Sequence, residues 1–91
     1  MHAIAPFALF AIESFQEATG YEFVSIDTHN LAIFKIPDNN AVTVCVEIFE
    51  QPKPLQIRVN SNSTGACLLY FSRGVHNLKM AKTLITLNLE G

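Results

Sequence analysis

The chain has 91 residues, of which 49% are hydrophobic and only 15% are charged, and its formal net charge is −2. This composition excludes an intrinsically disordered chain, and the length fits a single domain spanning residues 1–91. The small negative charge gives no general attraction to nucleic acid or to an anionic membrane. A chain this short buries only about 60–65% of its unfolded surface. We therefore expect exposed apolar side chains, either scattered singly or gathered in a patch that a partner covers.

The charges are unevenly distributed along the chain. Residues 1–50 carry seven acids and one base, whereas residues 51–91 carry five bases and one acid. Because both halves belong to one fold, the simplest consequence is charge complementarity within the molecule. Oppositely charged faces that orient a partner are the alternative.

The apolar run Ala3–Ile12 begins the first predicted element. It is too short to span a membrane, and it has neither the cationic start nor the cleavage site of a secretory signal. A helical wheel over residues 4–19 places the apolar side chains on one arc and the polar ones opposite. Pro6 suits the first helical turn and Gly20 a left-handed C-terminal cap. We therefore predict a core helix, no membrane association and a cytoplasmic location.

Two residues of this helix break the pattern. Leu9 and Phe10 project toward the polar side of the wheel, in the same rows as Glu13 and Glu17. Either they contact another subunit or partner, or another part of the chain covers them. They are the first candidates for a protein interface.

The middle of the chain predicts short strands. The strand-like segments, separated by turn residues, are 21–27, 31–36, 41–50, 55–62 and 66–72. Their connections are too short for parallel crossovers, so neighbouring strands must be antiparallel. The prediction is a meander of about five strands.

Residues 75–89 fit either a helix or, at their end, a strand. The helix is favoured because the apolar residues share one arc of a helical wheel. The predicted fold class is α+β: an N-terminal helix, the antiparallel meander and a C-terminal helix, with both helices packed on one sheet face. The uncovered face should carry alternate residues of the central strands, namely Thr43, Cys45, Glu47, Phe49, Gln56, Arg58 and Asn60. Phe49 is the third candidate for a partner interface.

Few residues suggest chemistry. His29 lies in a turn beside Asp27, where the two could form a carboxylate–imidazole pair, although Asp, Thr and Asn are also ordinary turn residues. Cys45 and Cys67 lie in apolar strand-like runs, which favours buried free thiols over a disulfide or a metal site. The spacings of Cys and His match no zinc motif. We predict no catalytic residues, no metal and no cofactor.

A cationic group near the C-terminal helix is the best candidate ligand site. Arg73, His76, Lys79 and Lys82 could bind a phosphate or a carboxylate. Such residues more often form a solvated helix face, made basic because it lies near a helix C-terminus. Two helical lysines are too few for the phosphate contacts of a nucleic-acid reader.

No motif specifies a reaction. The sequence favours a small non-enzymatic interaction module of adaptor or inhibitor type, which associates with itself or with another protein. The alternative is a small ligand-binding domain or minor enzyme whose anion site lies on the C-terminal helix.

Overall fold

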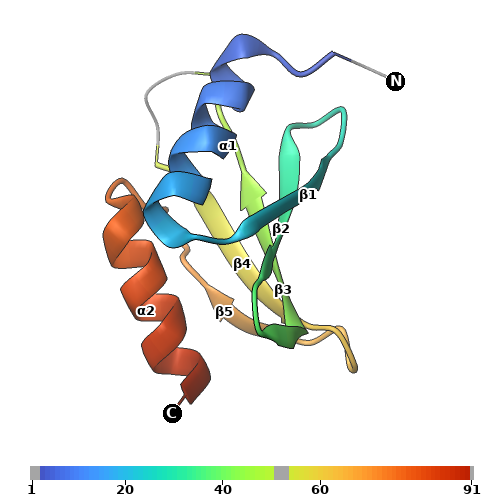
Figure 1. Cartoon of the computed structure of the whole chain (residues 1–91), viewed down its shortest axis with the longest axis vertical. Coiled ribbons are helices and arrows are strands. Elements are labelled where there is room, and N and C mark those ends of the chain that lie inside the picture. The colour runs from blue at the N-terminus through green and yellow to red at the C-terminus, as the bar shows by residue number, and fades with distance from the viewer. Residues whose placement is uncertain (1–2, 51–53, 91) are drawn as a thin grey trace.

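The computed structural model describes residues 3–50 and 54–90. In chain order, the elements are α1 (Pro6–Thr19), β1 (Glu22–Ile26), β2 (Leu31–Ile36), β3 (Asn39–Glu47), β4 (Gln56–Ser61), β5 (Cys67–Tyr70) and α2 (Leu78–Glu90). The predicted α+β class is confirmed: one helix precedes and one follows a five-stranded antiparallel meander along the chain (Figure 1).

The sheet follows the order of the chain. Its strands lie in the order β1-β2-β3-β4-β5, and every neighbouring pair is antiparallel. Consequently β1 and β5 are the two edge strands. The predicted turn at 37–40 is shorter than expected, because Asn39 and Asn40 already pair within β3.

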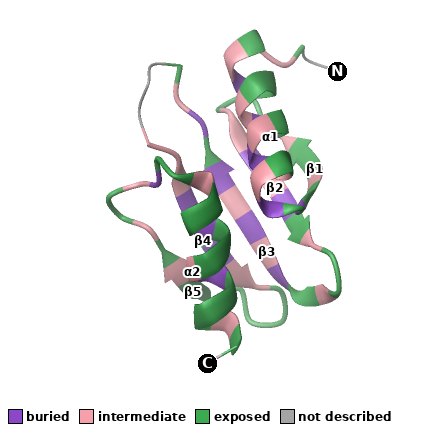
Figure 2. Cartoon of the chain, turned by 60° about the vertical axis from the view of Figure 1, so that its left-hand side comes forward, coloured by how far each residue is buried: buried purple, intermediate pink, exposed green. Residues whose placement is uncertain are grey.

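Both helices lie on the same face of the sheet (Figures 1 and 2). Phe15 of α1 shows how the two layers meet: its ring centroid lies 4.7 Å from that of Phe34 on β2 and 5.9 Å from that of Tyr21. One hydrophobic core joins the helices to alternate strand residues. Its most buried members include Ala8, Ile12, Phe15, Ala32, Phe34, Val44, Val46, Ile57, Val59, Ala81 and Ile85. We call this side the covered face and the other side the open face.

Helix α1 begins and ends as the sequence predicts. Pro6 occupies the first turn, where its missing N–H has no intrahelical partner to lose. Gly20 adopts φ 76° and donates its N–H to the carbonyl oxygen of Gln16 at 2.8 Å. Tyr21, which follows, is buried. Burial raises the pKa of Tyr21, and the Thr86 side chain on α2 lowers it by a smaller amount.

The C-terminal segment is helical, as predicted, but it starts later than residue 75. Asn77 precedes α2, and its Oδ1 accepts the N–H groups of Lys79 and Met80 at 3.1 and 3.3 Å. This N-cap leaves His76 outside the helix. Among the described residues, no helix is both long and apolar enough to cross a membrane.

A tight loop connects β5 to α2. Val75 pairs with Leu55 next to the start of β4, through N–H···O contacts of 2.8 and 3.0 Å. Gly74 adopts φ 75°, and a Cβ at this position would lie 2.6 Å from Cβ of Pro54. The loop therefore requires glycine, both for its left-handed backbone and for lack of space.

Candidate functional site

The predicted interface residues of α1 are exposed. Leu9 exposes 44% and Phe10 exposes 73% of its surface. The two point to different places: Leu9 lines a hollow with residues of β1, including Val24, whereas Phe10 lines a hollow on the other side of α1. Their exposure agrees with the helical wheel, and their role in a partner contact stays a prediction.

The predicted position of Phe49 on the open face is wrong. Strand β3 ends at Glu47, so the alternation of faces no longer applies two residues later. Phe49 is half-buried and lines, together with Phe10, a hollow of about 700 Å³ at α1. The structure thus brings two of the three predicted interface residues to one apolar hollow.

The predicted anion-binding residues all lie exposed in or just before the first turns of α2. Arg73 and His76 precede the helix, which corrects the expectation that His76 shares a helix face with Lys79 and Lys82. The explanation from the helix dipole is also wrong, because these cations lie at the N-terminal end of α2 and its last turn carries no base. Asn77 already binds two of the free N–H groups there. Anion binding at this end stays a prediction.

Four large apolar side chains remain exposed around β5 and α2. Leu68 and Tyr70 on β5 expose 47% and 54% of their surface, and Met80 and Leu87 on α2 expose 52% and 62%. The helical wheel placed Met80 and Leu87 on the apolar arc of α2. The sheet covers only part of that arc, so these two side chains stay exposed. Figures 1 and 2 show α2 and β5 side by side. Tyr70 lies on the open face beside Arg58, whereas α2 lies on the covered face, so the four side chains flank the β5 edge from both faces of the sheet. We call these four residues the β5–α2 surface.

Helical geometry explains why Met80 and Leu87 stay exposed. Leu78 faces a hollow beside α1, and Ile85 and Leu89 face a hollow beside Tyr21 and β2. Met80 and Leu87, seven residues apart, lie on the opposite flank of the helix. That flank points away from α1 and stays exposed.

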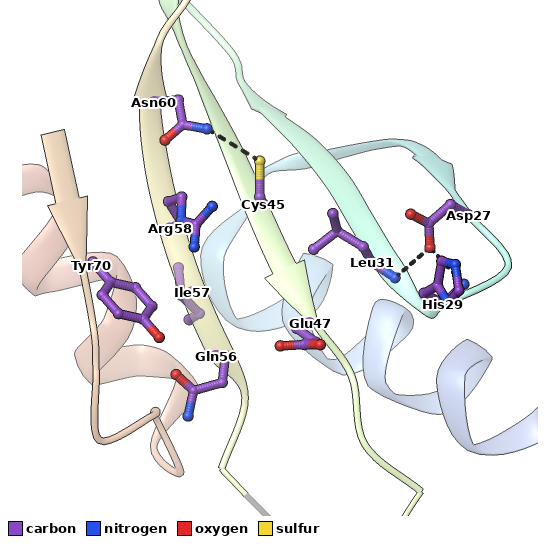
Figure 3. A pocket seen from close by; sticks show the side chains of 10 residues that line it. All are labelled: Asp27, His29, Leu31, Cys45, Glu47, Gln56, Ile57, Arg58, Asn60 and Tyr70. Carbon is purple, nitrogen blue, oxygen red and sulfur yellow. Dashed lines mark hydrogen bonds between the residues drawn. The ribbon is translucent and has the colours of Figure 1, made fainter. Parts of the chain in front are cut away.

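The open face has a separate polar hollow of about 420 Å³ (Figure 3). Residues of β2, β3, β4 and β5 and of the β1–β2 turn line it, and we call it the open-face hollow. Its lining includes Asp27, His29, Cys45, Glu47, Gln56, Arg58, Asn60 and Tyr70. The sequence predicted most of the strand residues for this face but neither Tyr70 nor the turn.

Arg58 lies in the middle of the open-face hollow. Strand register places it between Cys45 on β3 and Tyr70 on β5. Its guanidinium carbon is 5.4 Å from the centroid of the Tyr70 ring, a distance typical of a cation–π contact. Burial raises the pKa of the Cys45 thiol, while nearby Arg58 lowers it and Cys67 raises it, both by smaller amounts.

Two amide oxygens next to Arg58 lack hydrogen-bond partners. Oε1 of Gln56 and Oδ1 of Asn60 are both shielded from solvent, and neither accepts a hydrogen bond. The Asn60 amide nitrogen makes a long contact of 3.9 Å to the Cys45 sulfur (Figure 3). A buried acceptor without a donor costs about 1–3 kcal/mol, so both oxygens favour a bound donor.

Asp27 and His29 lie at one end of the open-face hollow. Oδ1 of Asp27 accepts the backbone N–H groups of His29 and Leu31, at 2.8 and 3.0 Å. This oxygen therefore stabilises the turn, in agreement with the ordinary turn interpretation of the segment.

The two cysteines are less buried than the sequence predicts. Cys45 is half-buried on the open face, whereas Cys67 is exposed on the edge strand β5. Both thiols are free. Because β4 lies between their strands, their backbones are about 10 Å apart, beyond the roughly 7 Å limit for a disulfide.

The meander also separates the charges in space. Because strand order follows chain order, the acidic first half forms the β1 side of the sheet and the basic second half forms the β5 side. The ion pair recorded between described residues, Lys35 with Glu22 at 3.2 Å, lies within the acidic half.

Comparison of the chain with family models, curated proteins and solved structures found no match.

Proposed function

We propose that this protein is a small non-enzymatic interaction module that forms a homodimer through the β5–α2 surface. The observation that carries the proposal is that four of the seven large hydrophobic side chains exposed among the described residues lie on β5 and α2, where they flank the β5 edge from both faces of the sheet. The exposed Cys67 thiol suits a reducing compartment such as the cytoplasm. The partner we infer is a second copy, related by a two-fold axis beside β5.

The main chain of β5 supports this arrangement. The Phe71 N–H donates to the Ile57 carbonyl oxygen at 3.0 Å, so the main-chain pairing groups of Phe71 point toward β4. Since antiparallel strands alternate their pairing groups, the N–H and C=O groups of Tyr70 point away from β4, whereas the register shift between Val59 and Asn60 interrupts the alternation at Leu68. No described strand pairs with that side of β5. Antiparallel pairing of two β5 strands would satisfy these groups and form one continuous sheet.

The exposed area is large enough for a weak dimer. A large side chain presents about 200 Å², and each of the four exposes about half, which gives roughly 400 Å² per copy and 800 Å² per dimer. The backbone of β5 and the half-buried Leu84 and Phe71 add to this value. The total approaches the roughly 1,000 Å² that a specific interface requires, which is the size of a weak, transient contact.

Charge does not oppose the contact. Residues 66–71 contain no charged side chain, although edge strands are often protected by lysine or proline. Lys82 lies on the flank of α2 that carries Leu78 and Leu89, away from Met80 and Leu87. The Lys82 side chains of the two copies therefore remain apart, whereas Arg58 lies against Tyr70 within each copy.

Sedimentation equilibrium at micromolar concentrations tests the proposal. We expect Leu68→Lys to weaken dimerisation at least tenfold, because the two-fold axis brings the two lysines close together. Val24→Lys is the matched control, since Val24 is equally exposed, at 54%, on the opposite edge strand. A monomer at all concentrations, or equal effects of both substitutions, would refute the dimer.

Leu9, Phe10 and Phe49 lie outside this dimer contact. We propose that the apolar hollow lined by Phe10 and Phe49 receives a different protein, as an adaptor or an inhibitor requires. Leu9 is the remaining candidate on α1. Phe10→Ser should then leave the dimer intact in the same sedimentation experiment, and a loss of dimer would instead assign Phe10 to the self-contact.

A further inference from the structure

We propose that the open-face hollow binds a small zwitterion, a molecule with one carboxylate and one ammonium group. The hollow, at about 420 Å³, lies within the range of about 300–1,000 Å³ usual for small-molecule sites. It lies on the sheet face opposite the helices, and it shares Tyr70 with the proposed dimer surface.

Arg58 forms the carboxylate-binding part of the site. Within the described part of the chain, its guanidinium forms no salt bridge. The contact with Tyr70 holds the guanidinium over the aromatic ring, and stacking of this kind leaves the N–H donors at its rim free. A planar guanidinium with free donors matches a carboxylate, which it can bind through two parallel hydrogen bonds.

Gln56 and Glu47 form the ammonium-binding part. Gln56 Oε1 is shielded from solvent and lacks a donor, and strand register places Glu47 directly opposite Gln56. An ammonium group supplies the missing donor and balances the carboxylate charge. Asn60 Oδ1, on the other side of Arg58, can accept a further N–H. Residues two apart on a strand are about 7 Å apart, which suits a ligand whose charges are separated by several bonds.

The charges of the hollow favour a zwitterion over a polyanion. Arg58 is opposed by two carboxylates among the lining residues, those of Glu47 and Asp27. A phosphate would bring two negative charges into this environment and be repelled. A zwitterion places one charge of each sign against its complement.

The probe is 4-aminobutyrate, titrated into the ¹⁵N-labelled protein and followed by amide chemical shifts. We expect saturable shifts on β3, β4 and β5, with affinity at least tenfold higher than for butyrate or butylamine. Arg58→Gln should abolish the shifts, and Glu47→Gln should reduce the preference over butyrate. Lys35→Gln removes an exposed cation outside the hollow and should change nothing.

Two results would overturn the proposal. One is an absence of saturable shifts, and the other is equal affinity for 4-aminobutyrate and butyrate. If Arg58→Gln fails to fold, Arg58→Lys keeps the charge but removes the planar donors, and it should weaken binding several-fold. The titration repeated on Leu68→Lys separates the two proposals, because ligand binding should persist in a monomer.

Discussion

Two phenylalanines on α1 allow a direct test of how the fold is stabilised. Phe15 is fully buried between the helices and the sheet, whereas Phe10 is 73% exposed on the same helix. Replacing a buried phenylalanine with alanine costs about 3–5 kcal/mol, through lost burial and the cavity left behind. A domain of this size has a free energy of unfolding of roughly 5–14 kcal/mol. Phe15→Ala should therefore remove about a fifth or more of the stability.

The matched change at Phe10 should have little effect. Only about a quarter of its surface is buried, so its loss should cost less than about 1 kcal/mol. Urea denaturation followed by circular dichroism measures both values. Phe15→Leu, which leaves a smaller cavity, provides a measurable variant if Phe15→Ala does not fold. Equal destabilisation by the two alanine substitutions would contradict the packing of α1 described above.

Three further predictions concern single positions. Gly74→Ala should lower the free energy of unfolding by more than Gly65→Ala does. Both residues have positive φ, but a side chain at Gly65 meets nothing within 4 Å. Thermal melts of Gly65→Ala should therefore show the backbone effect alone, about 1–2 kcal/mol. Because the folded state holds the Tyr21 proton more tightly than the unfolded chain, this contribution to stability is complete below about pH 10 and declines as the pH rises through the raised pKa of Tyr21. Tyr21→Phe should remove that alkaline decline in urea titrations, and an unchanged decline would contradict the assignment. Iodoacetamide near neutral pH should alkylate Cys67 before Cys45, because Cys45 is less exposed and burial raises the pKa of its thiol; mass spectrometry of the peptides would show the reverse order if this is wrong.

The regular elements could be predicted because their patterns are local. The change from a helical to a two-residue period after Gly20 separates α1 from the sheet, and short polar turns require antiparallel neighbours. Helix–strand ambiguity at the C-terminal end was resolved correctly by the apolar arc of α2. That arc could not reveal which part of it the sheet covers, so the exposure of Met80 and Leu87 was missed.

The open-face hollow depends on strand register, which one sequence does not specify. The alternation around Arg58 predicts its face, but only the pairing of β4 with β5 places Tyr70 against it. Phe49 was misplaced for the opposite reason. The two-residue alternation continues in the sequence as far as Phe49, but β3 ends at Glu47. The β1–β2 turn reaches the hollow through the sheet topology and carries no local signal of that position.

The contact between α1 and α2 has a consequence for folding during synthesis. The two helices touch, yet the entire meander separates them in the chain. While the ribosome is still making β5, hairpins of neighbouring strands can already form, but α1 lacks the helix beside it. A nascent chain halted before Leu78 should consequently bind hydrophobic dyes and chaperones, and synthesis of α2, Leu78–Glu90, should end that binding.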